Sequence, residues 1–236
     1  RFSARFTIDE SSAIKASYSR MYQYLHLASL SSVSLPVDVW YPTTEKTKPQ
    51  YADQVSLGYS RAIGSELYVN IEGYHKWMGN QVEFKDGTDL IGNPRVEDDF
   101  IYGAAKAYGV ETYIEKKNGR TRGWIGYTIA WATRTFEEIN DGHPFKPRYD
   151  RRHDISFVLM HKINDVFSVS LNWIYGSGAY TTLPVGRYVM QNDAGTVSRS
   201  VVPVFEGRNN YQLQPIHRLD LNLVTTLKSK RGKQDI

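Results

Sequence analysis

Paired carboxylates are the groups in this sequence whose spacing comes nearest to that of a catalytic site. Glu111 and Glu115, and the adjacent Glu137 and Glu138, offer the two carboxyl groups that glycoside cleavage requires, about 5 to 10 Å apart across the bond. The chain has 25 acidic residues, however, so pairs of this kind arise by chance. We expect these carboxylates to line a hydrated interior or to lie in loops, and we do not expect an enzyme.

Three histidines, His143, His153 and His161, are candidates for metal ligation, but no two of them have a close chelating spacing. The absence of cysteine also excludes thiolate metal sites and disulfide bonds. We therefore expect neither a metal nor another cofactor. His153 belongs to the segment RYDRRHD (148–154), where we expect it to pair with Asp150 or Asp154 at the point where a long loop re-enters a sheet.

Two pairs of residues are candidates for contact with a substrate. Trp40 and Tyr41 lie in the long segment 25–50 and offer exposed aromatic rings for stacking on a ligand. Arg148 and Arg151 carry guanidinium groups that donate two parallel hydrogen bonds to a carboxylate or a phosphate. A polar cluster within the protein is the alternative for the arginines.

The elements that must position these residues are strands, because apolar and polar residues alternate along most of the chain. Phe2, Ala4 and Phe6 alternate with polar residues near the start, and Leu219, Leu221 and Leu223 do so near the end. The pattern predicts an all-β, antiparallel, up-and-down fold. Its nine strands are expected near 2–8, 14–18, 54–60, 67–72, 110–115, 125–132, 154–159, 167–175 and 218–223.

The connections between the predicted strands alternate in length, which is typical of a transmembrane β-barrel with short turns on one rim and long loops on the other. The last long loop contains a possible hairpin of its own, with Tyr188–Met190 facing Val201–Phe205. The short turns are expected at Asp9, Gly64, Asn118-Gly119 and Asn164-Asp165, and the long loops at 25–50, 78–101, 138–152 and 185–210.

Loop asymmetry favours lipid on the apolar side of this sheet and a hydrated interior on the polar side. No apolar run approaches the roughly 18 residues of a spanning helix, which excludes a helical membrane protein. Alternation alone leaves open a soluble or surface-attached β-rich ligand-binding domain, and an enzyme on a β scaffold is a third possibility. The predicted interior face includes Arg5, Lys15, Glu72, Glu111, Glu115, Arg218 and Asp220.

The net charge of +4 does not indicate a nucleic-acid partner, because basic and acidic residues are interspersed. The dense basic run KSKRGK (228–233) is interpreted as a solvated turn.

Five segments together resemble TonB-dependent outer-membrane receptors of Bacteroidetes type, and the resemblance runs along essentially the whole chain. RYDRRHD (148–154) and HRLDL (217–221), in that order, are the more specific of them, and the others are SYSRM (17–21), KPQYADQVSLGY (48–59) and AYGVE (107–111). The resemblance implies a barrel of about 22 strands around an N-terminal plug. Residues 1–236 would then be a partial barrel domain, roughly strands 12 to 20, with the plug, the last strands and an upstream signal sequence absent.

The same resemblance implies active transport of a nutrient across the bacterial outer membrane, with this chain forming barrel wall and extracellular loops. The implied partners are outer-membrane lipid, the rest of the barrel and plug, the TonB complex acting through the N-terminal part, a surface lipoprotein and a small nutrient. The nutrient is left open between an iron chelate, a cobalamin, a glycan and a peptide.

Overall fold

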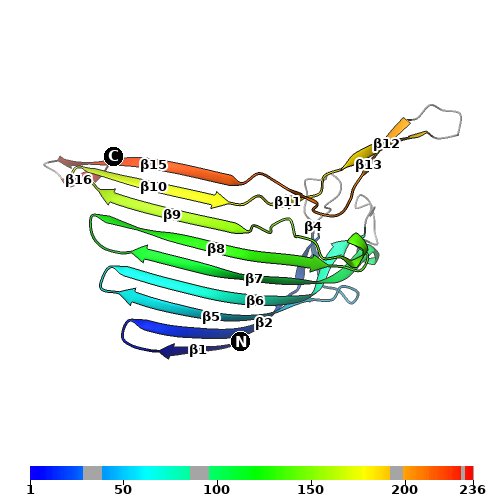
Figure 1. Cartoon of the computed structure of the whole chain (residues 1–236), viewed down its shortest axis with the longest axis horizontal. Coiled ribbons are helices and arrows are strands. Elements are labelled where there is room, and N and C mark those ends of the chain that lie inside the picture. The colour runs from blue at the N-terminus through cyan, green and yellow to red at the C-terminus, as the bar shows by residue number, and fades with distance from the viewer. Residues whose placement is uncertain (29–38, 86–95, 192–198, 230–231, 236) are drawn as a thin grey trace.

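The computed structural model describes residues 1–28, 39–85, 96–191, 199–229 and 232–235, and its main element is one curved antiparallel sheet of ten strands (Figure 1). Sheet neighbours follow one another in chain order, so the predicted all-β, up-and-down fold and its nine strands are confirmed. The strands are β1 (Phe2–Thr7), β2 (Ser12–Gln23), β5 (Gln50–Ile63), β6 (Leu67–Phe84), β7 (Phe100–Lys116), β8 (Thr121–Thr135), β9 (His153–Lys162), β10 (Phe167–Gly176), β15 (Ile216–Ser229) and β16 (Gly232–Asp235).

The tenth strand, β16, was not predicted. It pairs with the end of β15, where Lys228 lies opposite Lys233, so much of the basic run interpreted as a turn belongs to the two arms of a hairpin. Alternating lysines and glycine gave no apolar periodicity from which a strand could be predicted.

The long connections contain short ribbons instead of plain loops. β12 (Gly186–Gln191) pairs with β13 (Arg199–Val204), which confirms the predicted hairpin, and this hairpin projects beyond the end of the sheet (Figure 1). The segment 25–50, expected to be a loop, contains the pair β3 (Leu25–Ala28) and β4 (Val39–Pro42). Tyr180–Thr181 (β11) and Tyr211–Gln212 (β14) form a third ribbon.

Cross-strand register places the alternating apolar residues of the long strands on one face, although Trp124 and Ile174 lie on the other. Residues directly opposite each other in an antiparallel ladder point to the same side of the sheet. One row of this apolar face runs through Tyr18, Val55, His75, Tyr108 and Trp131 across five strands.

The opposite face is polar, as predicted. One of its rows begins with Arg5, Lys15 and Gly58 and continues through Glu72 and Glu111. Glu115 shares this face because it lies four residues after Glu111 on the same strand. Arg218 and Asp220 share it because they alternate with Leu219 and Leu221 of the apolar face.

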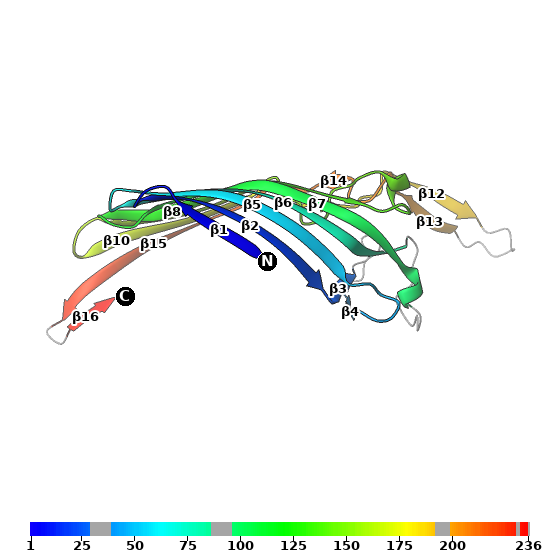
Figure 2. The same cartoon turned by 90° about the horizontal axis from the view of Figure 1, so that it is seen from below.

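The apolar face is uncovered in the described part of the chain. Leu57, Leu221 and Leu223 are 63%, 68% and 65% exposed, and Figure 2 shows the sheet as a single curved layer. The large buried apolar side chains lie instead at the end with the long connections, in two small clusters: Val82, Phe84 and Phe100, and Ile101, Phe136, Ile139 and Phe145.

Charged residues bound the apolar face at both ends. On β7, Lys106 and Lys116 enclose the apolar stretch, and on β5 Asp53 and Arg61 do so. Asp53 is paired with Arg20 at 3.3 Å. Ten residues of strand span about 33 Å, which at barrel tilt gives a height of roughly 25 Å, the usual height of a lipid-facing band.

The ten-stranded sheet does not close on itself. β1 and β16 form its two edges, each with one paired neighbour among the described strands. In the same residues the only helices are two 3-10 turns, Val96–Asp99 and Asn140–Gly142, and neither is long or apolar enough to cross a membrane.

Two glycines on neighbouring strands test how tightly the ladder is packed. A Cβ added at Gly109 would lie 2.7 Å from the carbonyl oxygen of Ile129, whereas one added at Gly73 would meet nothing nearer than 3.9 Å. Gly109→Ala is therefore expected to destabilise the folded protein by about 1 to 3 kcal/mol. Gly73→Ala is expected to be neutral or stabilising by up to about 1 kcal/mol. Urea unfolding measures both, and equal effects would contradict the described packing.

Candidate functional site

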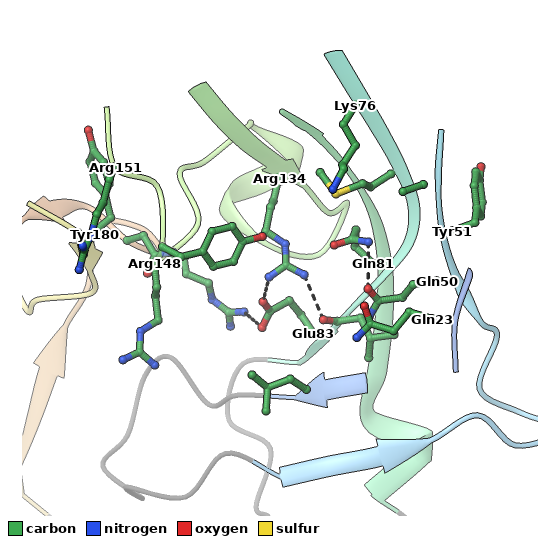
Figure 3. A pocket seen from close by; sticks show the side chains of 18 of the residues that line it. Gln23, Gln50, Tyr51, Lys76, Gln81, Glu83, Arg134, Arg148, Arg151 and Tyr180 are labelled. Atoms are coloured by element: carbon green, nitrogen blue, oxygen red, sulfur yellow. Dashed lines mark hydrogen bonds and ion pairs between the residues drawn. The ribbon is translucent and has the colours of Figure 1, made fainter. Parts of the chain in front are cut away.

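A cavity of about 1110 Å³ opens on the polar face at the end of the sheet that carries the long connections (Figure 3). Its walls come from the ends of β2, β5, β6 and β8 and from segments between β8 and β15. The lining residues used below are Gln23, Leu27, Gln50, Tyr51, Lys76, Gln81, Glu83, Arg134, Arg148, Tyr149, Arg151, Tyr180 and Arg208.

A β-bulge in β6 directs two of these side chains into the cavity. The pairing of β6 with β7 is regular up to Met78 and resumes at Gln81, one residue out of step. Asn80 has a positive φ of 53°, and its side-chain amide donates to the carbonyl of Pro49 at 3.0 Å. Because alternate residues face opposite sides, the extra residue places Gln81 and Glu83 on the polar face in place of Val82 and Phe84.

Glu83 is the centre of a buried ionic triad. One carboxylate oxygen accepts from Arg134, and the other is 3.2 Å from the guanidinium of Arg208. The side chains of Arg208, Glu83 and Arg134 are only 7%, 9% and 12% exposed. Arg134 also donates to the carbonyl of Val82 at 3.2 Å, which fixes its orientation. The triad ties the segment before β14 to the ends of β6 and β8, and it retains one net positive charge.

Arg148 and Arg151 lie on another wall of the same cavity, as Figure 3 shows. The backbone carbonyl of Arg148 accepts from the amide of Tyr180 at 3.2 Å, so the segment is anchored through its backbone while both guanidinium groups are left exposed. The structure therefore brings these two predicted residues into the same cavity as Arg134 and Lys76.

The neighbours of the two arginines hold the segment in place. Asp150 is 3% exposed and accepts from the backbone amide of Ala132 at 2.9 Å. Arg152 points to the other face, where its guanidinium lies 4.6 Å from the ring centroid of Trp131. Segment 148–154 thus sends successive arginines to opposite sides of the wall.

The histidines take structural positions. His153 does not pair with Asp150 or Asp154 as expected, since its Nδ1 lies 2.9 Å from the hydroxyl of Tyr127 on the neighbouring strand. His161 contacts the hydroxyl of Thr121 at 2.8 Å. The described residues contain no group of side chains suited to a metal ion.

Trp40 and Tyr41 do not act together. Trp40 is 58% exposed, but Tyr41 packs against the Val82, Phe84 and Phe100 cluster, with its ring nearly perpendicular to that of Phe100 and the two ring centroids 5.2 Å apart. Burial raises the pKa of the Tyr41 hydroxyl, and Glu97 adds a smaller contribution in the same direction. Neither residue lines the cavity.

Four charged residues of the cavity were missed by sequence reasoning: Lys76, Glu83, Arg134 and Arg208. Glu83 and Arg208 are separated by 125 positions, so no local motif connects them. The available signal was Gly79-Asn80, a pair typical of turns and bulges inside a stretch of alternating residues.

No protein-family model and no curated protein matches the sequence. Solved structures do match. The closed form of the ferric-catecholate import receptor Fiu from E. coli K12 gives a TM-score of 0.60 at 16% identity over 96% of this chain and 28% of that one. The outer-membrane ferripyoverdine receptor of Pseudomonas aeruginosa gives 0.59 at 14% identity, over 94% and 26%. The iron transporter FrpB from Neisseria meningitidis gives 0.57 at 11%, over 94% and 31%.

These likenesses define the fold. The chain has the architecture of a segment of an outer-membrane receptor barrel, and it spans between 26% and 31% of the length of those three proteins.

Removing the charge of Glu83 tests the triad. Glu83→Gln removes the negative charge that Arg134 and Arg208 share in a largely buried site, so we expect the protein to lose about 3 to 5 kcal/mol of stability. The matched control is Glu66→Gln, which breaks an exposed ion pair with Lys116 (3.3 Å) and is expected to cost under about 1 kcal/mol. Urea unfolding measures both losses of stability. A loss for Glu83→Gln as small as that of the control would contradict a stabilising role for the triad.

His26 provides a pH test at the rim. It is fully buried beside Leu27 of the cavity wall, its Nε2 lies 3.2 Å from the Thr43 hydroxyl, and burial lowers its pKa. When the β3–β4 ribbon opens, His26 regains its ordinary pKa of about 6.5 and takes up a proton more readily than in the closed ribbon. The stability of the closed ribbon is therefore lost as the pH falls below about 6.5 towards the lowered pKa. Hydrogen exchange of β3 and β4 amides should quicken over that range beyond its intrinsic pH dependence. His26→Gln should abolish the additional effect, and its persistence would point to another group.

Proposed function

We propose that this chain forms part of the wall and extracellular rim of a TonB-dependent barrel that imports a nutrient across the bacterial outer membrane. The observation that carries the proposal is the uncovered apolar face, which on β5 and β7 is bounded by charged residues at both ends. Such a band matches hydrocarbon between two headgroup layers.

The physical argument starts from the exposed leucines and aromatic rings. In water an apolar area of this size would drive association, whereas in lipid it needs no cover. The polar face then borders water, where Arg5, Glu72 and Asp220 keep their hydration without a buried partner. The soluble alternative requires the apolar stripes to pack on each other, and the described residues leave them exposed.

Aromatic rings at the long-connection end support the same orientation. His75 stacks on Tyr108 with centroids 5.7 Å apart, and Tyr108 stacks on Trp131 at 5.3 Å. Arg152 covers the Trp131 ring. Rings with one wet edge favour the headgroup level, which places the long connections and the cavity just outside the hydrocarbon.

The two unpaired edges of the sheet indicate that further strands complete the barrel. Unpaired backbone groups cost several kcal/mol each in lipid, so the outer edges of β1 and β16 require further strands. We assign those strands and the plug to the remainder of a longer protein, whose N-terminal part would contact the TonB complex. A surface lipoprotein is an additional proposed partner at the extracellular rim. Import receptors and transporters among the matched structures support a transport role.

Arginine substitution on the two faces tests the assignment. Leu221 lies in the middle of the apolar band and Asn222 beside it on the polar face. In the full-length protein folded in lipid vesicles, Leu221→Arg is expected to cost about 2 to 4 kcal/mol. Asn222→Arg, the matched control, is expected to cost under about 1 kcal/mol.

Fractionation of cells provides the second measurement. The full-length protein is expected in the outer-membrane fraction and in solution only with detergent. Recovery in the soluble fraction, or equal costs for the two arginine variants, would overturn the proposed function.

A further inference from the structure

We propose that the rim cavity binds a ligand carrying at least two anionic groups, carboxylates or phosphates, and this rests on the proposed function because a hydrated polar face is what gives the ligand access. The inference concerns the chemical class of the nutrient, which the fold leaves open.

The charge of the described cavity lining is strongly one-sided. It contains five basic side chains, Lys76, Arg134, Arg148, Arg151 and Arg208, and one acidic side chain, Glu83. The whole chain has 29 basic and 25 acidic residues, so 24 of each remain outside this lining. The basic excess of the sequence is therefore matched by the excess at this one site.

Glu83 neutralises only part of that charge. Its two oxygens are occupied by Arg134 and Arg208, both of which are largely buried and fixed in place. Among the residues that the structure describes, no carboxylate is paired with Lys76, Arg148 or Arg151. Arg134 also has a buried Nε without a hydrogen-bond partner. The cavity thus has hydrogen-bond donors for which the described part of the chain supplies no acceptor.

The positions of these side chains suit a ligand with more than one anionic group. In Figure 3, Arg148 and Arg151 come from one wall, Lys76 from the opposite wall, and Arg134 lies between them. Guanidinium groups match carboxylate and phosphate geometry with two parallel hydrogen bonds each. Basic groups on two walls favour a ligand with more than one anionic group, because each wall can then bind one of them.

Neutral groups complete the lining. Gln23, Gln50 and Gln81 offer amides, and Gln81 donates to Gln50 at 3.1 Å. Tyr149 and Tyr180 offer aromatic surface. Amides and aromatic rings are suited to many classes of ligand, so they do not identify this one. The unmatched cations therefore determine the class of ligand.

The test measures binding to the full-length receptor in detergent by titration calorimetry. Citrate supplies carboxylates, inorganic tripolyphosphate supplies phosphates, and sucrose is the neutral comparison. We expect at least one of the two anions to bind, sucrose not to bind, and affinity to fall at least tenfold between 50 and 500 mM salt. Which anion binds more tightly distinguishes a carboxylate ligand from a phosphate ligand.

Side-chain substitutions locate the binding. Arg148→Gln combined with Arg151→Gln should weaken anion binding at least tenfold, because both residues are exposed and their guanidinium groups form no ion pair with a described residue. Arg122→Gln, an exposed arginine at the short-turn end of the polar face, should leave it unchanged. Equal extraction from membranes and equal unfolding midpoints show that the variants are folded.

Two results would overturn the inference: no binding of either anion, or binding that the double variant leaves unchanged. Neither result touches the membrane assignment, which fractionation and the Leu221 variant decide separately. Conversely, a soluble protein that binds the anions through Arg148 and Arg151 would sink the transport proposal and leave the anion site standing.

Discussion

The unbroken register of the antiparallel ladder is the constraint on which the rest of this structure depends. Because side chains alternate with a period of two, a slip of one residue between any two strands would exchange the two faces from that point on. From β1 to β15 the pairing keeps the apolar set on one side, and among the described pairs the shift in β6 lies beyond the band. A coherent outer surface is the product of that register.

The same rule explains why the most buried ion pairs of the described residues lie at one rim. Inside the band the outward positions are occupied by apolar groups, and the inward positions mix both charge signs, as Lys15 and Glu72 on either side of Gly58 show. Beyond the band the strands continue with ribbons stacked against them, which excludes enough water to bury Glu83 with Arg134 and Arg208. Burying this triad costs desolvation free energy, but its ion pairs fix the positions of the three side chains. The exposed Arg148 and Arg151 therefore lie in a cavity of which another wall is rigid.

Sequence periodicity predicted the strands because a half-buried strand has a local signature, and it predicted the β12–β13 hairpin for the same reason. Arg148 and Arg151 were found through a local motif. The triad was not, since its members meet only after the sheet has formed. His153 was assigned to a neighbouring carboxylate by sequence proximity, whereas its partner Tyr127 comes from the adjacent strand. Trp40 and Tyr41 are adjacent in sequence, but alternation within β4 turns them to different surroundings.

The irregularity at Gly79-Asn80 gives this rim a simple route to a new chemistry. Glycine suits position 79 because the ring of Tyr51 occupies the space that a Cβ would need. Losing a single codon there would restore the two-residue period and turn Val82 and Phe84 inward, while Gln81 and Glu83 turned outward. The apolar band of every strand would be untouched. The lining of this cavity can thus be changed by an insertion or deletion in a strand as well as by substitutions in the connecting segments.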